Sequence, residues 1–242
     1  MFRYFDVVKG LLDEVQSSER ESMEQAADVI ASSIADGRVL HYFAAGHSHM
    51  LGDELFYRAG GLAPVNVILE PALMVANGAS KSSRMEQLPG LAQIILAESE
   101  VRSGDVMIIS SNSGINPVPV EMAAAAMDMH VRVIAITSVA SSRDIPIRNS
   151  LGKRLYELAD VVIDTHVPYG DAAVAVDGLA QKIAPVSTAV GVVIINSIVV
   201  RVVEKLMERG IDPPIFASSN IPGGAEHNAA YLAKYKQLIK SL

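Results

Sequence analysis

Residues 104–114 read Gly-Asp-Val-Met-Ile-Ile-Ser-Ser-Asn-Ser-Gly, an apolar run that ends in a small polar turn. The run 106–109 predicts a buried strand, and the alanine-rich run 118–129 predicts the helix that follows it. Residues 44–49 form a second polar turn, again between a strand-like and a helix-like run. Unpaired N–H groups at the start of a helix favour negative charge, so the two turns predict an anion site.

The same alternation of strands and helices continues through most of the chain. It predicts an α/β fold, namely a doubly wound parallel five-stranded sheet in a flavodoxin-like three-layer sandwich. Apolar residues at three- and four-residue spacing also predict an N-terminal helical arm, residues 1–37, before a single domain, residues 38–242. The other predicted elements are strands 38–45, 65–69, 131–137 and 161–164, helices 48–59 and 89–100, and a mobile loop at 77–84.

Composition narrows the classes of protein to which the chain can belong. Of its 242 residues 50% are hydrophobic and 19% are charged, as in a globular protein with a large core. The net charge of −7 argues against a nucleic-acid partner, which would need a basic surface. The chain has no cysteine and its first residues do not resemble a secretory signal, so we expect a cytoplasmic location.

Residues 183–200 contain no charged side chain and reach the lower limit of length for a membrane span. Polar residues and Pro185 interrupt the run, and Arg201 continues it into a charged end, so we expect no membrane partner. An apolar helix in such a protein is usually buried on several sides. We therefore expect self-association, as a homodimer or homotetramer, through this helix and the N-terminal arm.

Three segments resemble the sugar isomerase, or SIS, family of phosphosugar-binding domains. They are residues 104–114 with the later Val-Ile-Ala-Ile-Thr-Ser at 133–138, the turn Ala-Gly-His-Ser at 45–48, and Ala-Pro-Val-Ser-Thr-Ala at 184–189. The last segment looks like the one that closes over the sugar in arabinose-5-phosphate isomerases. The resemblance covers roughly residues 38–209, and the whole chain is similar to a bacterial SIS group named for phosphoheptose isomerase.

The resemblance implies a sugar phosphate as ligand and an SIS domain as the fold. Some phosphoheptose isomerases use a metal, but His47 and His49 alone in a turn do not make a metal site, so we expect no metal and no cofactor here. The implied phosphate-binding residues are Gly46, Ser48, Ser111, Asn112, Ser113, Gly114, Ser187 and Thr188.

Catalytic residues are harder to assign, because one expected histidine is absent. Arabinose-5-phosphate isomerases have His-Pro-Gly-Gly near the C-terminus, whereas here Asn220-Ile221 precedes Pro-Gly-Gly. Glu226 or His227, which follow shortly, are candidates to move the proton. Glu54 and His47 are the other candidates, and a partner subunit is a further source of a histidine.

Other roles are open for the same residues. Glu54 can instead form a salt bridge with Arg58, and one of His47 and His49 can simply cap the helix or face the neighbouring subunit. The leading function is isomerisation of an aldose or ketose phosphate. The alternatives are a lyase that acts on a phosphorylated amino-sugar ether and a sugar-phosphate sensor without chemistry.

Overall fold

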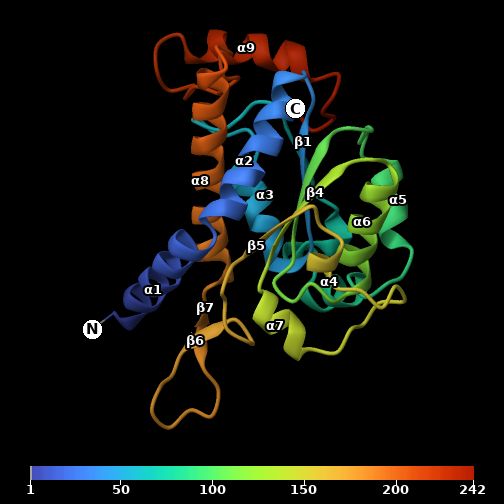
Figure 1. Cartoon of the computed structure of the whole chain (residues 1–242), viewed down its shortest axis with the longest axis vertical. Coiled ribbons are helices and arrows are strands. Elements are labelled where there is room, and N and C mark those ends of the chain that lie inside the picture. Colours follow the sequence, from blue (N-terminus) through green and yellow to red (C-terminus); the bar gives the residue numbers. More distant parts are fainter. Residues whose placement is uncertain (1) are drawn as a thin grey trace.

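The structure is a computed structural model, and it describes residues 2–242. Its centre is a five-stranded sheet in the order β2-β1-β3-β4-β5, in which all neighbouring strands are parallel (Figure 1). The predicted α/β class, strand number and strand direction are confirmed. The strands are β1 (Leu40–Ala44), β2 (Val65–Ile68), β3 (Val106–Ser110), β4 (Arg132–Thr137) and β5 (Val161–Asp164).

The strand order reverses between β1 and β3. From β1 the chain continues to β2 on one side, and from β3 it continues to β4 on the other, while Leu40 of β1 pairs with both Val65 and Val106. Open α/β sheets bind their ligands at such a reversal, beyond the carboxyl ends of the strands. The two polar turns of the sequence follow β1 and β3, so both lie at this place.

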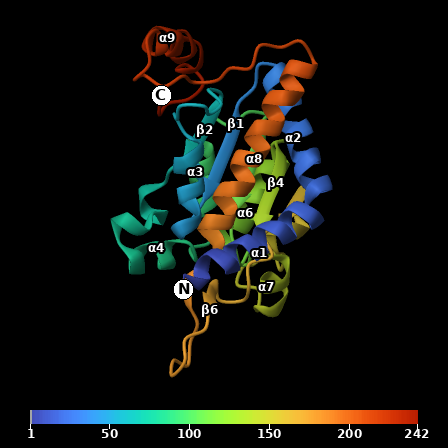
Figure 2. The same cartoon turned by 90° about the vertical axis from the view of Figure 1, so that its left-hand side faces the viewer.

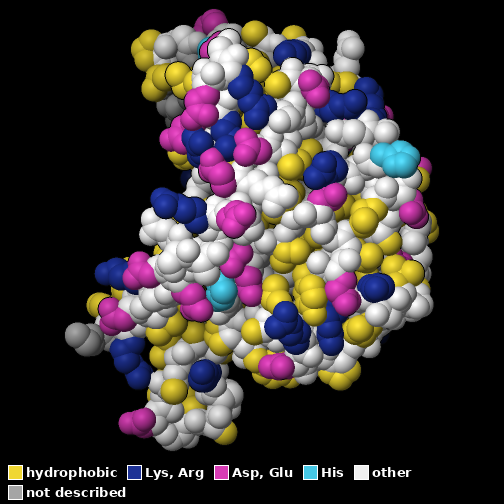
Figure 3. Space-filling model, in the orientation of Figure 1, with side chains coloured by type: hydrophobic (Ala, Val, Ile, Leu, Met, Phe, Trp, Pro, Cys, Tyr) yellow, Lys and Arg dark blue, Asp and Glu magenta, His cyan; other side chains and the backbone are white. Residues whose placement is uncertain are grey.

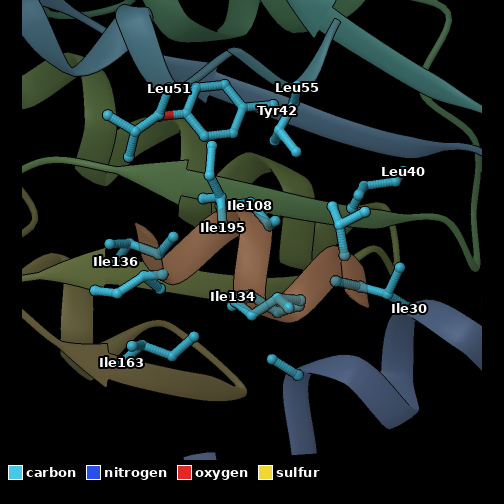
Figure 4. Packing of buried hydrophobic residues seen from close by; sticks show 14 of the residues in the cluster. Ile30, Leu40, Tyr42, Leu51, Leu55, Ile108, Ile134, Ile136, Ile163 and Ile195 are labelled. Carbon is cyan, nitrogen blue, oxygen red and sulfur yellow. The ribbon is translucent and has the colours of Figure 1, made fainter. Parts of the chain in front are cut away.

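One face of the sheet packs against the helices α1, α2, α3 and α8 (Figure 2). Apolar side chains such as Tyr42 and Ile108 of the strands contact Ile30 of α2 and Ile195 of α8 in one core (Figure 4). These helices are α1 (Arg3–Ser18), α2 (Arg20–Ala35), α3 (Met50–Leu55) and α8 (Ser187–Glu208).

Strand residues that alternate with the first set, such as Phe43 and Met107, point to the other face. There α5 and α6 cover them in a second core, which completes the predicted three-layer sandwich. The helices on this side and at the carboxyl ends of the strands are α4 (Ala79–Met85), α5 (Leu91–Ala97), α6 (Pro117–Asp128) and α7 (Val139–Asp144).

The predicted N-terminal arm consists of α1 and α2. α2 is part of the main core, with Ile30 fully buried, whereas α1 buries only Val15 among its residues. The boundary between residues 37 and 38 stays a prediction.

The last helix, α9 (Gly224–Tyr235), lies at the amino end of the sheet (Figures 1 and 2). Tyr235 packs with Val39, just before β1, and with Ala63, just before β2. The opposite end of the molecule carries a projecting hairpin, β6 (Ala172–Val174) and β7 (Ile183–Pro185), whose strands are antiparallel. The hairpin was not predicted from the sequence.

Two predicted elements are wrong in detail. The expected helix 48–59 is a 3₁₀ turn, Gly46–His49, followed by the short helix α3, because the chain becomes extended at Phe56. The expected mobile loop 77–84 is instead mainly the helix α4. Its Ser82 is buried, and the Ser82 hydroxyl donates to the carbonyl of Leu73 at 2.7 Å, which fixes the helix to the preceding segment.

None of the helices in residues 2–242 combines the length and the apolar character that a membrane crossing requires.

Candidate functional site

The first polar turn follows β1. Gly46 adopts φ +60°, a left-handed conformation that favours glycine. The Tyr42 hydroxyl donates to the Ser48 carbonyl at 2.7 Å, and the His49 ring bonds to the Gly46 carbonyl. These contacts fix the half-buried Ser48 and leave His47 exposed.

The second polar turn follows β3 and is held by backbone bonds to its neighbours. The Ser111 amide donates to the carbonyl of Ile136 at 3.1 Å, and the Ser138 amide donates to that of Asn112 at 3.1 Å. Gly114 has φ +58°, and a Cβ there would lie 3.0 Å from the Thr137 hydroxyl oxygen. The second turn therefore requires glycine at position 114.

The start of α8 is the third polar segment at this edge. The carboxylate of Asp171, just before β6, accepts from the amides of Val186 and Ser187 at 2.9 and 2.8 Å, and from the Ser187 hydroxyl at 2.7 Å. Gly191, one turn further on, lets α8 approach Leu51 of α3, because a Cβ there would lie 2.6 Å from a Leu51 methyl. The approach of Gly191 to Leu51 brings the start of α8 close to the first polar turn, because α3 directly follows that turn.

A cavity of about 20 Å³ lies where the three segments meet. The Ser110 side chain is nearly buried, at 3% exposed. Among the described residues, the Ser110 hydroxyl and the Asn112 amide oxygen belong to the few buried polar atoms without a hydrogen-bond partner. Such atoms are rare and indicate a missing partner. The lining consists of Ser48, Leu51, Ser110, Asn112, Ile136, Thr165, Ser187, Thr188 and Gly191.

The residues predicted to hold phosphate thus fall into two groups. Four of them, Ser48, Asn112, Ser187 and Thr188, line the cavity itself. The other four lie in the turns that frame it. Of these, Ser111 uses its hydroxyl oxygen to accept from the Gly114 amide at 3.2 Å, and Ser113 is half-buried.

Sequence analysis missed three residues at this site. Ser110 and Thr165 line the cavity, and Asp171 binds the start of α8. Ser110 and Thr165 immediately follow the predicted strands 106–109 and 161–164. Counting the first polar residue after each strand as part of the site would have found them. Asp171 has no such signal, because its role depends on the unpredicted hairpin.

The candidate catalytic residues lie away from the cavity lining. Glu54 of α3 pairs with Arg58, the structural alternative considered from the sequence, and accepts from the Asn196 amide at 3.1 Å. His47 is exposed.

Glu226 and His227 belong to α9, at the opposite end of the sheet (Figure 1). The His227 ring Nε2 donates to the Ile215 carbonyl at 2.9 Å. The His227 and Tyr231 rings contact each other in an edge-to-face arrangement. Within one chain, neither residue is positioned at the cavity.

Two buried groups near the polar turns have raised pKa values. Burial raises the pKa of the Tyr42 hydroxyl, which keeps Tyr42 a neutral donor to the first turn. Burial likewise raises the pKa of Glu86 at the end of α4, although its carboxylate accepts from the Asn116 amide at 2.9 Å. Glu86 also escaped the sequence analysis.

The SIS domain model matches residues 3–138. The chain belongs to the SIS domain family. A UPF0309 protein of Geobacillus kaustophilus is 40% identical over 240 residues, which cover 99% of this chain and 96% of that protein. The SIS domain match begins in α1, so it includes the predicted arm as well as the two polar turns.

Solved SIS structures share the fold at low sequence identity. A phosphoheptose isomerase of Francisella tularensis has a TM-score of 0.55 at 14% identity, covering 82% of this chain and 94% of that chain. The NanR protein of Vibrio vulnificus, solved in complex with ManNAc-6P, has a TM-score of 0.53 at 13% identity, covering 94% of this chain and 66% of that chain. These similarities support the SIS fold of the present chain.

No three His, Cys, Asp or Glu side chains in residues 2–242 are grouped closely enough to hold a metal ion. A second hollow, of about 570 Å³, is a groove between α8 and the helices α1 and α2, away from the cavity at the polar turns. Apolar side chains such as Val193 and Ile198 contribute much of its lining, and it lacks the converging hydroxyls of the cavity.

Proposed function

We propose that this SIS protein binds a phosphorylated sugar at the carboxyl end of its sheet and interconverts aldose and ketose forms. The observation that carries the proposal is the buried Ser110 hydroxyl without a partner, in a cavity where three polar segments meet. A buried polar group without a partner is costly, and a ligand group in the cavity supplies one. The phosphate lies on the Ser48 and Ser111–Ser113 turns, and one sugar group enters the cavity.

The V. vulnificus protein in complex with ManNAc-6P and the F. tularensis phosphoheptose isomerase support this class of ligand. The acidic net charge of −7 agrees with a small-molecule ligand rather than nucleic acid. We also propose that the protein is located in the cytoplasm and has no membrane partner.

Catalysis needs a group that moves a proton between two adjacent carbons of the sugar. None of the residues that line the cavity, all of them described, has an ionisable carboxylate, imidazole or amine. This fact favours a second candidate function, a sensor that binds the sugar phosphate without chemistry. For the isomerase, the acid or base must come from outside the cavity lining.

A second copy of the chain is the proposed source. On the open side of α8, Val193, Val200 and Met207 recur at seven-residue spacing and are 43%, 59% and 65% exposed. Residues seven apart lie on one face of a helix, and an apolar repeat of this kind pairs with another helix. We call these three residues the α8 stripe. Two copies of the stripe, related by a two-fold axis, would cover each other in a homodimer.

An antiparallel pairing of the two α8 helices would also complete the site. The cavity lies at the start of α8, and α9 follows its end, about 33 Å away for 22 residues. The two-fold axis exchanges these ends. It would carry Glu226 of the partner subunit and the partner's His227 toward the cavity, where one of them moves the proton. The contacts of the polar turns with the phosphate supply binding energy for this step.

Incubation of the protein with aldose and ketose monophosphates in heavy water tests the proposal. Isomerisation predicts deuterium at the carbon next to the carbonyl together with formation of the other sugar. Binding without exchange contradicts the isomerase and supports the sensor. Cleavage of a phosphorylated amino-sugar ether, without exchange of simple sugar phosphates, supports the lyase instead.

Coexpression of two impaired variants, assayed at a sugar-phosphate concentration well below the wild-type Kd, tests the shared site. Ser110→Ala removes the cavity contact and His227→Ala removes the proposed imidazole, each in its own chain. If the two residues act across the dimer, mixed dimers contain one intact site and recover exchange activity. If both residues act within one chain, or if His227→Ala alone keeps full activity, the shared site is wrong.

A further inference from the structure

Asp171 uses its carboxylate to bind the start of α8. It accepts from two backbone amides and from the Ser187 hydroxyl, all within 2.9 Å. It is held in a left-handed conformation, φ +65°, at the base of the hairpin. A non-glycine residue with positive φ is uncommon and costs conformational energy, so the surrounding contacts must fix it there.

The contacts of Asp171 decide which hydrogen bonds Ser187 can offer on the α8 side of the cavity. A serine hydroxyl has one proton, and Ser187 donates it to Asp171 at 2.7 Å. Toward the cavity, Ser187 can then only accept. The amides of Val186 and Ser187, which would otherwise favour an anion at the helix start, are also occupied.

The negative charge of Asp171 also disfavours an anion at the start of α8. Its carboxylate is one hydrogen bond away from Ser187, which lines the cavity. A second negative group at this place would meet like charge and find no free donor on Ser187. The second polar turn offers the opposite kind of hydrogen bond. The Ser111 hydroxyl oxygen accepts from the Gly114 amide, so the Ser111 hydroxyl proton is available to donate to a ligand.

The size of the cavity agrees with a small neutral group. About 20 Å³ exceeds the roughly 10–15 Å³ that a water-sized group needs. A sugar hydroxyl of this size can donate its one proton to Ser187 or to the unpartnered Asn112 oxygen, and can accept from the Ser110 hydroxyl. A phosphoryl group carries only acceptors when it is fully ionised.

We infer that Asp171 is a specificity-determining residue, which makes the α8 side of the site accept a sugar hydroxyl and reject a carboxylate or second phosphate. The inference rests on the proposed sugar-phosphate site. It orients the ligand, with the phosphate on the turns and the hydroxyl-bearing end at α8. It also assigns Ser187 to a sugar hydroxyl, whereas the family resemblance implied the phosphate.

The test compares two ligands of the same carbon chain, one of which carries a negative charge at the end opposite the phosphate. One is an aldose monophosphate, and the other is the aldonate monophosphate of the same carbon chain, in which the aldehyde is oxidised to a carboxylate. Calorimetry gives their affinities for the wild type and for Asp171→Asn. The asparagine oxygen still accepts from the α8 amides, so the cap is kept and the charge is removed.

The wild type should bind the aldose more tightly, by about tenfold or more, because juxtaposed like charges cost binding energy. Asp171→Asn should bring the affinity ratio of the two ligands close to one. Asp177→Asn is the control, because Asp177 is exposed on the tip of the same hairpin, and it should leave the ratio unchanged.

Two results would overturn the inference. An unchanged affinity ratio in Asp171→Asn, whether the two affinities stay the same or fall equally, means that Asp171 only caps the helix, while the sugar-phosphate site stands. A wild type that binds neither ligand contradicts the proposed function itself. Thermal unfolding of Asp171→Asn separates a lost cap from a changed selectivity.

Discussion

The hydroxyl of Ser110 distinguishes a ligand site from ordinary packing. Ser33 provides a matched control, because its hydroxyl is also buried and without a partner among the described residues, but it lies on α2. Replacing either serine by alanine removes an unsatisfied polar group, so the free energy of unfolding should stay the same or rise slightly.

Only Ser110→Ala should weaken binding of an aldose or ketose monophosphate, by about tenfold, equivalent to about 1.4 kcal/mol. Titration calorimetry measures the affinity, and chemical denaturation measures the stability. Equal affinities for wild type and Ser110→Ala would remove Ser110 from the site.

Gly114 gives a prediction about the second turn. Gly114→Ala should destabilise the protein by about 1–3 kcal/mol, because alanine is strained at positive φ and its Cβ would crowd Thr137 and Leu155. Gly37, with φ +75° and open space around it, is the control and should lose less stability on substitution by alanine. Urea unfolding compares them, and equal losses would argue against crowding at Gly114.

At the scale of elements, an ion network joins α2 to α8. Arg201 and Lys205 of α8 contact Glu24 of α2 at 2.8 and 2.7 Å. Figure 3 shows acidic and basic side chains gathered over these helices. The hydrogen bond from Arg201, then that from Lys205, lowers the pKa of Glu24 from 4.5 to about 2.

This lowered pKa makes the network sensitive to acid. The stabilisation is fully present above about pH 4.5, where the unfolded chain is also ionised, and is lost as the pH falls toward 2. Glu24→Gln should therefore lower the free energy of unfolding at neutral pH, by about 1 kcal/mol or less because the pair is partly exposed.

Denaturation of wild type and Glu24→Gln across this pH range measures the effect. The difference between them should shrink toward pH 2. Glu208→Gln, which removes a more exposed partner of Arg201, is the control and should change stability less. A difference that persists unchanged in acid would contradict the assigned role of Glu24.

The sequence was a good guide to elements whose burial is continuous. The strands β1, β3 and β4 are apolar runs, buried almost throughout, and the turns after β1 and β3 contain the small residues that such turns need. α4 and the hairpin escaped prediction because hydrogen bonds, rather than apolar periodicity, hold them to a residue outside the polar stretch and to the α8 helix, respectively. Ser82 bonds to Leu73, and Asp171 bonds to Ser187 across the hairpin.

The site was predictable to the same degree. Serine and glycine after a strand identify Ser48 and Asn112 as neighbours, because parallel strands end at one edge. The direction of a hydroxyl proton is not in the sequence, so the sequence does not distinguish a sugar hydroxyl from a phosphate as the ligand of Ser187. Position along the chain also placed Glu226 near the motifs, whereas α9 folds to the opposite end of the sheet.

At the scale of the whole molecule, the α8 stripe predicts a homodimer. Val200→Asp places a charge in the centre of the proposed interface but not in the core, since Val200 is 59% exposed. Light scattering should give a dimer mass for the wild type and a monomer mass for Val200→Asp. Ile94→Asp, at a 65% exposed position on α5, should remain dimeric. A monomeric wild type would contradict the pairing.

The central claim is that the cavity between the two polar turns and α8 is the sugar-phosphate site. Hydrogen–deuterium exchange of the backbone, with and without the aldose or ketose monophosphate that binds most tightly, tests it most directly. The account predicts slower exchange in residues 46–49, 110–114 and 187–191 together, because all three segments contact one ligand. Slower exchange confined to the groove between α1 and α8, or unchanged exchange at the polar turns with ligand bound, would contradict it.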